Sequence, residues 1–171
     1  LGFANVHVEP FEIANGWVRG AEQAEIIAPF PQPLRLTALG GSGATGPAGL
    51  TGEIVAFATL DALRAADPAT VRGKIVYLGN QMAPARDGSN YAAFASYRRK
   101  GPSVAAQKGA LAILVRSIGT DHHRLPHAGE TDWAAGVAPI PAAALAAPDA
   151  EQIERVLARG KPIVVHLLLT P

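Results

Sequence analysis

The spacing of apolar side chains predicts extended chain, not helix, at the start of the sequence. From Phe3 to Ile13 apolar side chains recur at roughly every second position, which is typical of a strand on a half-buried surface. Three prolines between residues 29 and 33 exclude a helix or a central strand at that point. A second strand is predicted over residues 34–39, where Leu34 and Leu36 share one face.

The rest of the chain contains further short apolar runs with the length and composition of buried strands. Glycine-rich or polar segments separate these runs, as expected of loops, and the segment 117–137 is a long polar example. The last run is apolar on both faces except at His166. Strands are predicted over residues 54–57, 75–78, 110–115, 140–145 and 162–169.

Signals for helices lie between the predicted strands. Thr59 is expected to cap one short helix. Pro102 is expected in the first turn of another helix, which ends at Gly109. The clearest helix covers residues 149–160, with Asp149 as its expected N-cap.

Strands outnumber helices in this pattern, and a chain of 171 residues is long enough to bury one core. We therefore predict an α+β fold for a single domain over residues 1–171. Its core is expected to be a β-barrel-like or two-sheet structure with a few flanking helices.

The composition removes several classes of function. Fifteen basic and fourteen acidic side chains nearly cancel, so no long-range positive field would attract nucleic acid. The chain has no cysteine, which excludes disulfides and thiolate metal sites. No apolar run reaches the roughly twenty residues that a membrane-spanning helix needs. The chain starts with Leu1 and no signal-like segment follows, so we expect an excised part of a longer protein.

Residues 41–46 read GSGATG, the letters of a dinucleotide-binding fingerprint. That motif needs a helix whose N-terminus opens within it and receives the pyrophosphate. Pro47, Gly49 and Gly52 are incompatible with such a helix, and a strand is predicted directly afterwards. The preferred interpretation is a flexible connection, and no cofactor is expected in this chain.

The loop 121–132 concentrates side chains that bind metals. They are Asp121, His122, His123, His127, Glu130 and Asp132. His123 and His127 have the spacing of a zincin helix, but no glutamate general base lies between them and Pro126 opposes the helix. Ser117, His127 and a nearby aspartate have the chemistry of a nucleophilic triad, but no strained turn presents the serine. An autonomous metal-binding or hydrolytic protein centred on this loop is therefore the alternative function.

Short motifs along most of the chain occur in the order and spacing of a known domain. They include Asn5, Val6 and His7; Trp17 to Gly20; Gly73 to Val76; Tyr97 and Arg98; Arg116 and Ser117; and Pro126, His127 and Gly129. On these motifs the chain resembles the protease-associated domain of the carboxypeptidase Q family, dizinc exopeptidases with this domain inserted near the start of the catalytic fold. Ala128 departs from the family's usual threonine, and residues 121–123 have no recognised counterpart.

The resemblance implies a non-catalytic domain of a secreted or periplasmic, and so extracytoplasmic, zinc exopeptidase. Such a domain would act as a lid, a substrate-access module or a protein-interaction module. Its implied partners are its own peptidase catalytic domain and a peptide substrate, with no nucleic acid and no membrane span. The two zinc ions would lie in the catalytic domain, so no metal ligand or catalytic residue is expected in this chain.

Arg116, Ser117 and His127 are the candidate binding residues. They lie at a predicted strand end and in the following loop, where a rigid scaffold displays its contacts, and they match the family's motifs. We expect them to contact a substrate terminus or the catalytic domain. The alternative is structural: Arg116 would hold loop carbonyls, Ser117 would cap a turn, and His127 would satisfy a buried backbone group.

Overall fold

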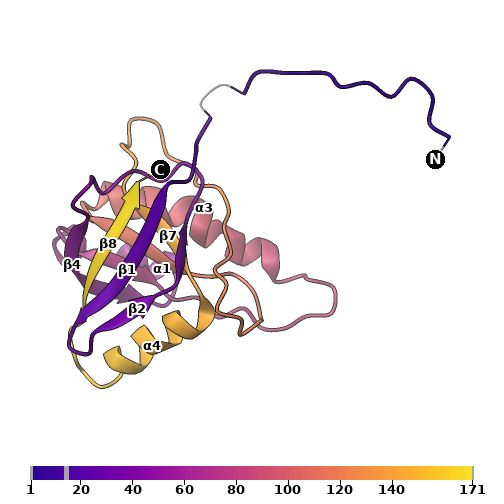
Figure 1. Ribbon diagram of the computed structural model, residues 1–171. Helices are drawn as coiled ribbons and strands as arrows, with labels where there is room; N and C mark the ends of the chain where they lie inside the picture. Colours follow the sequence, from indigo (N-terminus) through magenta and orange to yellow (C-terminus); the bar gives the residue numbers. More distant parts are fainter. Residues whose placement is uncertain (1, 14–15, 171) are drawn as a thin grey trace.

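The strands of the described residues, 2–13 and 16–170, form one continuous curved sheet. In chain order they are β1 (Ala21–Ala28), β2 (Gln32–Leu34), β3 (Leu36–Ala38), β4 (Leu50–Phe57), β5 (Ile75–Leu78), β6 (Ala112–Arg116), β7 (Ala142–Leu145) and β8 (Val164–Thr170). Their order across the sheet is β2-β1-β8-β4-β5-β6-β7-β3. Figure 1 shows this computed structural model, in which the sheet wraps around an apolar interior.

The two strands at the ends of this order, β2 and β3, follow one another in the chain with only Arg35 between them. Leu34 and Leu36, on either side of Arg35, both belong to the interior apolar cluster. The covalent chain therefore links the two edges, and the sheet forms a nearly closed barrel. The predicted barrel-like α+β core is confirmed.

Four adjacent strands, β4 to β7, run parallel to one another. Parallel neighbours need crossover connections, and helices occupy two of them. The helices α1 (Leu60–Ala65) and α2 (Pro68–Val71) lie between β4 and β5, and α3 (Tyr91–Gln107) lies between β5 and β6. A further helix, α4 (Ala147–Leu157), follows β7. Because these strands are parallel, their carboxyl ends lie along the same edge of the sheet.

Two apolar clusters stabilise this arrangement. In the barrel interior, Ala150, Ile153 and Val156 of α4 pack against side chains from the strands. Their spacing of three residues places them on one face of the helix. Outside the barrel, α1 and α3 cover the alternate side chains of β5 and β6. Figure 1 shows α4 at one end of the barrel and α3 along its outer side.

The strand predicted from Phe3 to Ile13 is wrong. Residues 2–13 form no strand in the described chain, and Figure 1 shows this segment leaving the barrel as an extended tail. Its apolar side chains are exposed: Val6 by 81% and Val8 by 91%. An alternating pattern produces a strand only where another surface pairs with it, and the described residues offer none to this segment.

The strand predicted over residues 34–39 is divided between β2 and β3. β2 pairs with β1, whereas β3 pairs with β7, so the chain changes partner at Arg35. Pro33 lies within β2, which is tolerated because β2 pairs on one side only.

The helix predicted to begin at Pro102 in fact begins at Tyr91, so Pro102 lies inside α3. An interior proline removes one helical hydrogen bond. The neighbouring Gly101 lets the helix approach the sheet closely, since a Cβ there would lie 3.1 Å from Leu78 Cδ2. Gly101, Pro102 and Ser103 are all buried, so tertiary packing outweighs the local preference.

The expected N-cap of the last helix is also wrong. α4 has Ala146 as its N-cap and starts at Ala147, with Pro148 in its first two positions, where proline favours helix initiation. Asp149 instead lies in the first turn and is 1% exposed.

Candidate functional site

Polar side chains gather at the carboxyl ends of the parallel strands β5 and β6. In open sheets with parallel strands this edge is where ligands commonly bind, because the loops that follow the strands diverge there. Arg116 is the last residue of β6, and Asn80 follows β5 by two positions. Asn80 Nδ2 donates a hydrogen bond of 2.9 Å to the carbonyl oxygen of Arg116, which ties the two strand ends together.

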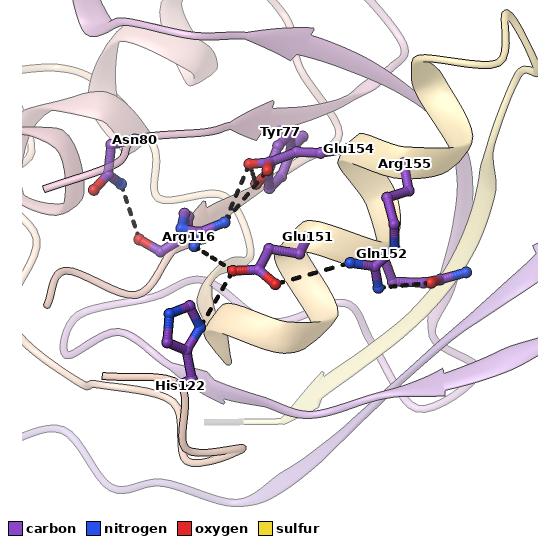
Figure 2. A network of polar contacts seen from close by, with 8 residues as sticks. All are labelled: Tyr77, Asn80, Arg116, His122, Glu151, Gln152, Glu154 and Arg155. Carbon is purple, nitrogen blue, oxygen red and sulfur yellow. Dashed lines mark hydrogen bonds and ion pairs between the residues drawn. The ribbon is translucent and has the colours of Figure 1, made fainter. Parts of the chain in front are cut away.

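Arg116 connects the sheet to α4 through two carboxylates, as Figure 2 shows. Its Nη2 lies 2.9 Å from Glu151 Oε1, while its Nη1 lies 3.4 Å and 3.3 Å from the two oxygens of Glu154. Tyr77 donates a hydrogen bond of 2.7 Å to Glu154 Oε1. Glu151 and Glu154 are three residues apart, so both point from the same face of the helix.

Burial gives this network unusual protonation properties. The pKa of Tyr77 is raised well above its ordinary value, first because the ring is buried and then because its hydroxyl donates to the Glu154 carboxylate. Burial alone would lower the pKa of Arg116, but the hydrogen bond that it donates to Glu151 and the charge of Glu154 raise the pKa overall. Tyr77 therefore stays neutral and Arg116 stays charged at neutral pH.

Ser117 and His127 meet on the other side of β6. Successive residues in an extended strand point to opposite faces, so Ser117 faces away from α4 while Arg116 faces toward it. The backbone N–H of His127 donates to Ser117 Oγ at 2.8 Å. The structure thus brings Ser117 and His127 into contact and separates both side chains from the Arg116 network.

The imidazole of His127 holds the start of the long loop. Its Nδ1 lies 2.7 Å from the carbonyl oxygen of Ile118, so Nδ1 carries the proton and donates it. Its Nε2 lies 3.0 Å from Asp121 Oδ2. The His127 and Asp121 side chains are 35% and 36% exposed, so this pair is open to solvent or to a partner.

Three further contacts hold the segment 117–137 against the barrel. Arg124 binds Asp149 through two hydrogen bonds of 2.9 Å and 2.7 Å and also donates to the carbonyl of Pro33. Asp132 pairs with Arg99 of α3 at 2.9 Å. Trp133 Nε1 donates to the carbonyl of Gly41 at 2.8 Å. The loop lacks helices and strands but is attached to α4, α3 and the glycine-rich segment.

Two clefts open along this edge and share Gln81. The larger has a volume of about 480 Å³ and the smaller about 210 Å³. The larger is lined by Ala56, Phe57, Ala58, Tyr77, Gly79, Gln81, Glu154 and Leu157. Among the residues that line the smaller are Arg116, Asp121, His122 and Glu151.

The geometry does not support a triad centred on Ser117. In such a triad a nitrogen of the imidazole faces the serine hydroxyl and accepts its proton. Here Ser117 Oγ accepts from the backbone of His127, and the two ring nitrogens face Ile118 and Asp121.

The metal ligands suggested by the loop 121–132 are dispersed. His122 faces Glu151 at 3.5 Å, while Asp121 and Asp132 face His127 and Arg99. Within residues 2–13 and 16–170, no group of three or more histidines, aspartates or glutamates is arranged to hold a metal ion. Residues 41–46 are followed by β4 and not by a helix, so the dinucleotide motif also lacks its anion site.

Sequence reasoning missed Tyr77, Glu151, Glu154 and the pair of Arg124 with Asp149. The spacing of Glu151 and Glu154 on a predicted helix was visible in the sequence. The strand that faces this helix was not, because it depends on the closure of the barrel. The pairing of Arg124 with Asp149 has no local signal, because the two residues lie 25 positions apart in the sequence.

Comparison with known proteins agrees with the family resemblance. Bovine carboxypeptidase Q is 37% identical over 166 residues, which are 97% of this chain and 34% of the bovine protein. The chain is homologous to a segment of carboxypeptidase Q. It spans about a third of the length of the carboxypeptidase Q sequences that it matches. No protein-family model matches the chain.

Solved structures extend this homology to the fold. A peptidase M28 precursor from Shewanella amazonensis is 46% identical, with a TM-score of 0.86 over 88% of this chain and 34% of that protein. An aminopeptidase from Aneurinibacillus sp. strain AM-1 is 16% identical, with a TM-score of 0.59 over 90% of this chain and 31% of that protein. The second likeness establishes a shared fold alone. None of the helices in the described part of the chain has the length and apolarity to cross a membrane.

Proposed function

We propose that this chain is a non-catalytic protease-associated domain of a zinc exopeptidase, and that it limits or guides the access of peptide substrate. The observation that carries this proposal is coverage: nearly all of this chain aligns with only a third of carboxypeptidase Q. The remaining two thirds of such a protein would contain the peptidase catalytic domain and its two zinc ions.

The path of the chain through the barrel supports an inserted domain. β1 pairs with β8, and Ala21 and Thr170 are register partners although they lie 149 residues apart in sequence. The chain therefore enters and leaves the barrel at the same place. Domains whose ends lie close together can be inserted into another fold with little disturbance of either.

The exposed segment from Phe3 to Ile13 supports contact with a neighbouring domain. Phe3 and Phe11 are 80% and 82% exposed, and Val6 and Val8 between them are also exposed. Large apolar side chains that are exposed together along one segment are typical of protein interfaces. We infer that it packs against the peptidase catalytic domain.

The edge that carries Arg116, Ser117 and His127 is the part of the barrel that we assign to the substrate side. His127 and Asp121 are partly exposed there, and Asp121 and Arg116 line the smaller cleft. A rigid wall beside a zinc centre can restrict substrate length and exclude water without touching the bond that is cut. We also propose that the parent enzyme works outside the cytoplasm, as the family resemblance implies.

One experiment tests the proposal that the barrel has no catalytic role. In the full-length parent enzyme, residues 21–170 are replaced by a short linker, which is feasible because Ala21 and Thr170 are neighbours. We expect the shortened enzyme to keep its zinc content and its hydrolysis of a dipeptide, and to change its preference for longer peptides. Loss of bound zinc from a shortened enzyme that is still folded would overturn the proposal.

A second experiment tests the substrate-side edge. His127→Ala in the parent enzyme is expected to raise KM or to change the preferred peptide length, with kcat little altered. His123→Ala is the matched control, because His123 is an exposed histidine of the same loop. A lower melting temperature with unchanged kinetic constants would mean that His127 has only a structural role.

A further inference from the structure

The larger cleft contains a carboxylate with unused capacity to accept hydrogen bonds. Glu154 receives one short hydrogen bond, from Tyr77 at 2.7 Å. Its contacts with Arg116, at 3.3 Å and 3.4 Å, are longer than the 2.7–2.9 Å that is usual for charge-assisted pairs. Arg116 makes its short bond with Glu151 instead, at 2.9 Å. A carboxylate offers about four acceptor positions, so Glu154 can take a further donor.

Gly79 keeps the approach to this carboxylate open. A Cβ at position 79 would lie 3.3 Å from Glu154 Oε1, 3.3 Å from the Tyr77 hydroxyl and 2.9 Å from Tyr77 Cε1. Gly79 is not among the glycines with positive φ, so its backbone conformation does not require glycine. A side chain at position 79 would fill the space beside Glu154 and Tyr77.

The remaining wall of the cleft is apolar. Phe57 and Leu157 are partly exposed and line the cleft, together with Ala56 and Ala58. Glu154 is the charged residue in this lining. An apolar wall next to one carboxylate favours a ligand that carries a positive charge beside an apolar group.

We propose that this cleft binds a protonated amine carried next to an apolar side chain, with Glu154 and Tyr77 at the charged end. The amine donates to the Glu154 carboxylate, and the apolar group packs against Phe57 and Leu157. Such an amine is found at the amino terminus of a peptide and on a lysine side chain. Binding needs no neighbouring peptidase domain, because every group named belongs to this chain.

The test is a titration of the 171-residue chain, followed by NMR, with three small amides. Leucinamide presents a terminal amine, N-acetyl-lysinamide presents a side-chain amine, and N-acetyl-leucinamide presents none. We expect saturable shifts at residues around the cleft with at least one amine, with a dissociation constant on the order of 1 mM. N-acetyl-leucinamide is expected to bind at least tenfold more weakly. The amine that binds more tightly identifies the source, and equal binding of all three compounds, or of none, overturns the proposal.

Two variants test the residues. Glu154→Gln removes the charge but still accepts the Tyr77 hydrogen bond, and it is expected to weaken amine binding at least tenfold. Glu25→Gln, which makes the same charge change on exposed β1, is the matched control and is expected to bind like the original chain. Unchanged binding by Glu154→Gln overturns the proposal. Gly79→Ala is expected to block binding by filling the space, and if that variant does not fold, Glu154→Gln still decides the question.

Discussion

The pair of Arg124 and Asp149 offers the sharpest stability prediction, because its two members differ so much in exposure. The Asp149 side chain is 1% exposed and the Arg124 side chain is 49% exposed. Arg124→Ala leaves a buried carboxylate without its partner, whereas Asp149→Ala leaves an arginine that water can reach. We therefore expect the two single substitutions to have unequal effects on the free energy of unfolding.

The magnitudes follow from this difference. Loss of one partner from a fully buried pair costs about 3–5 kcal/mol, and partial access of water to Arg124 reduces this to about 2–3 kcal/mol for Arg124→Ala. Asp149→Ala removes two hydrogen bonds but leaves no buried charge without a partner. We therefore expect it to lower the free energy of unfolding by about 1 kcal/mol. The double variant should resemble Asp149→Ala, because it contains no unpaired carboxylate. A coupling free energy of about 2–3 kcal/mol is therefore expected.

Urea denaturation followed by tryptophan fluorescence measures these values, with a shift in melting temperature of about 2–4 °C per kcal/mol as a second readout. Trp133 lies in the attached loop and reports on its release. Additive effects of the two substitutions would refute the reasoning. An Arg124→Ala variant as stable as the original would refute it as well.

Three further predictions concern stability. Gly20→Ala should lower the denaturation midpoint, because a Cβ at Gly20 would overlap the carbonyl of Thr170; Gly16→Ala, which has open space around it, should not. Above pH 10, the ordinary pKa of tyrosine, the unfolded chain releases a proton that folded Tyr77 keeps, so stability should fall as pH rises; Tyr77→Phe should reduce this slope, and an unchanged slope would contradict it. A chelator should leave the melting temperature unchanged, and a marked fall would indicate a structural metal.

The sequence was sufficient for the elements whose pattern reflects local packing. Ile75 to Leu78 and Ala112 to Val115 are apolar runs, and both lie in buried strands. Thr59 caps α1 as expected, with its hydroxyl accepting from Ala62. These elements were predictable because their burial follows from a few neighbouring residues.

The elements that failed depend on partners distant in sequence. Residues 3–13 have the pattern of a strand but lie outside the barrel. On the two sides of Arg35 the chain pairs with different strands, β2 with β1 and β3 with β7, and no local sequence pattern predicts this change of partner. Asp149 has the residue type of an N-cap, but it is buried and pairs with Arg124, which lies 25 residues earlier in the sequence. Barrel closure decides each of these cases.

The same dependence on distance appears in the candidate site. Sequence motifs identify Arg116, Ser117 and His127. Because side chains alternate along β6, however, Arg116 contacts α4 whereas Ser117 contacts His127. The partners of Arg116 could not be assigned before the position of α4 was known. Whether Arg116, Ser117 and His127 bind substrate stays a prediction.

The position of β8 has a consequence for how the domain forms. β8 is the last strand in the chain but lies between β1 and β4, so each of those strands keeps one unpaired edge until residues 164–170 are present. Contacts between such distant segments form only after a long loop has closed, and the entropy cost of closing that loop slows folding. During synthesis the edges of β1 and β4 that pair with β8 stay open until β8 has left the ribosome, and unpaired strand edges of this kind make a chain prone to aggregate.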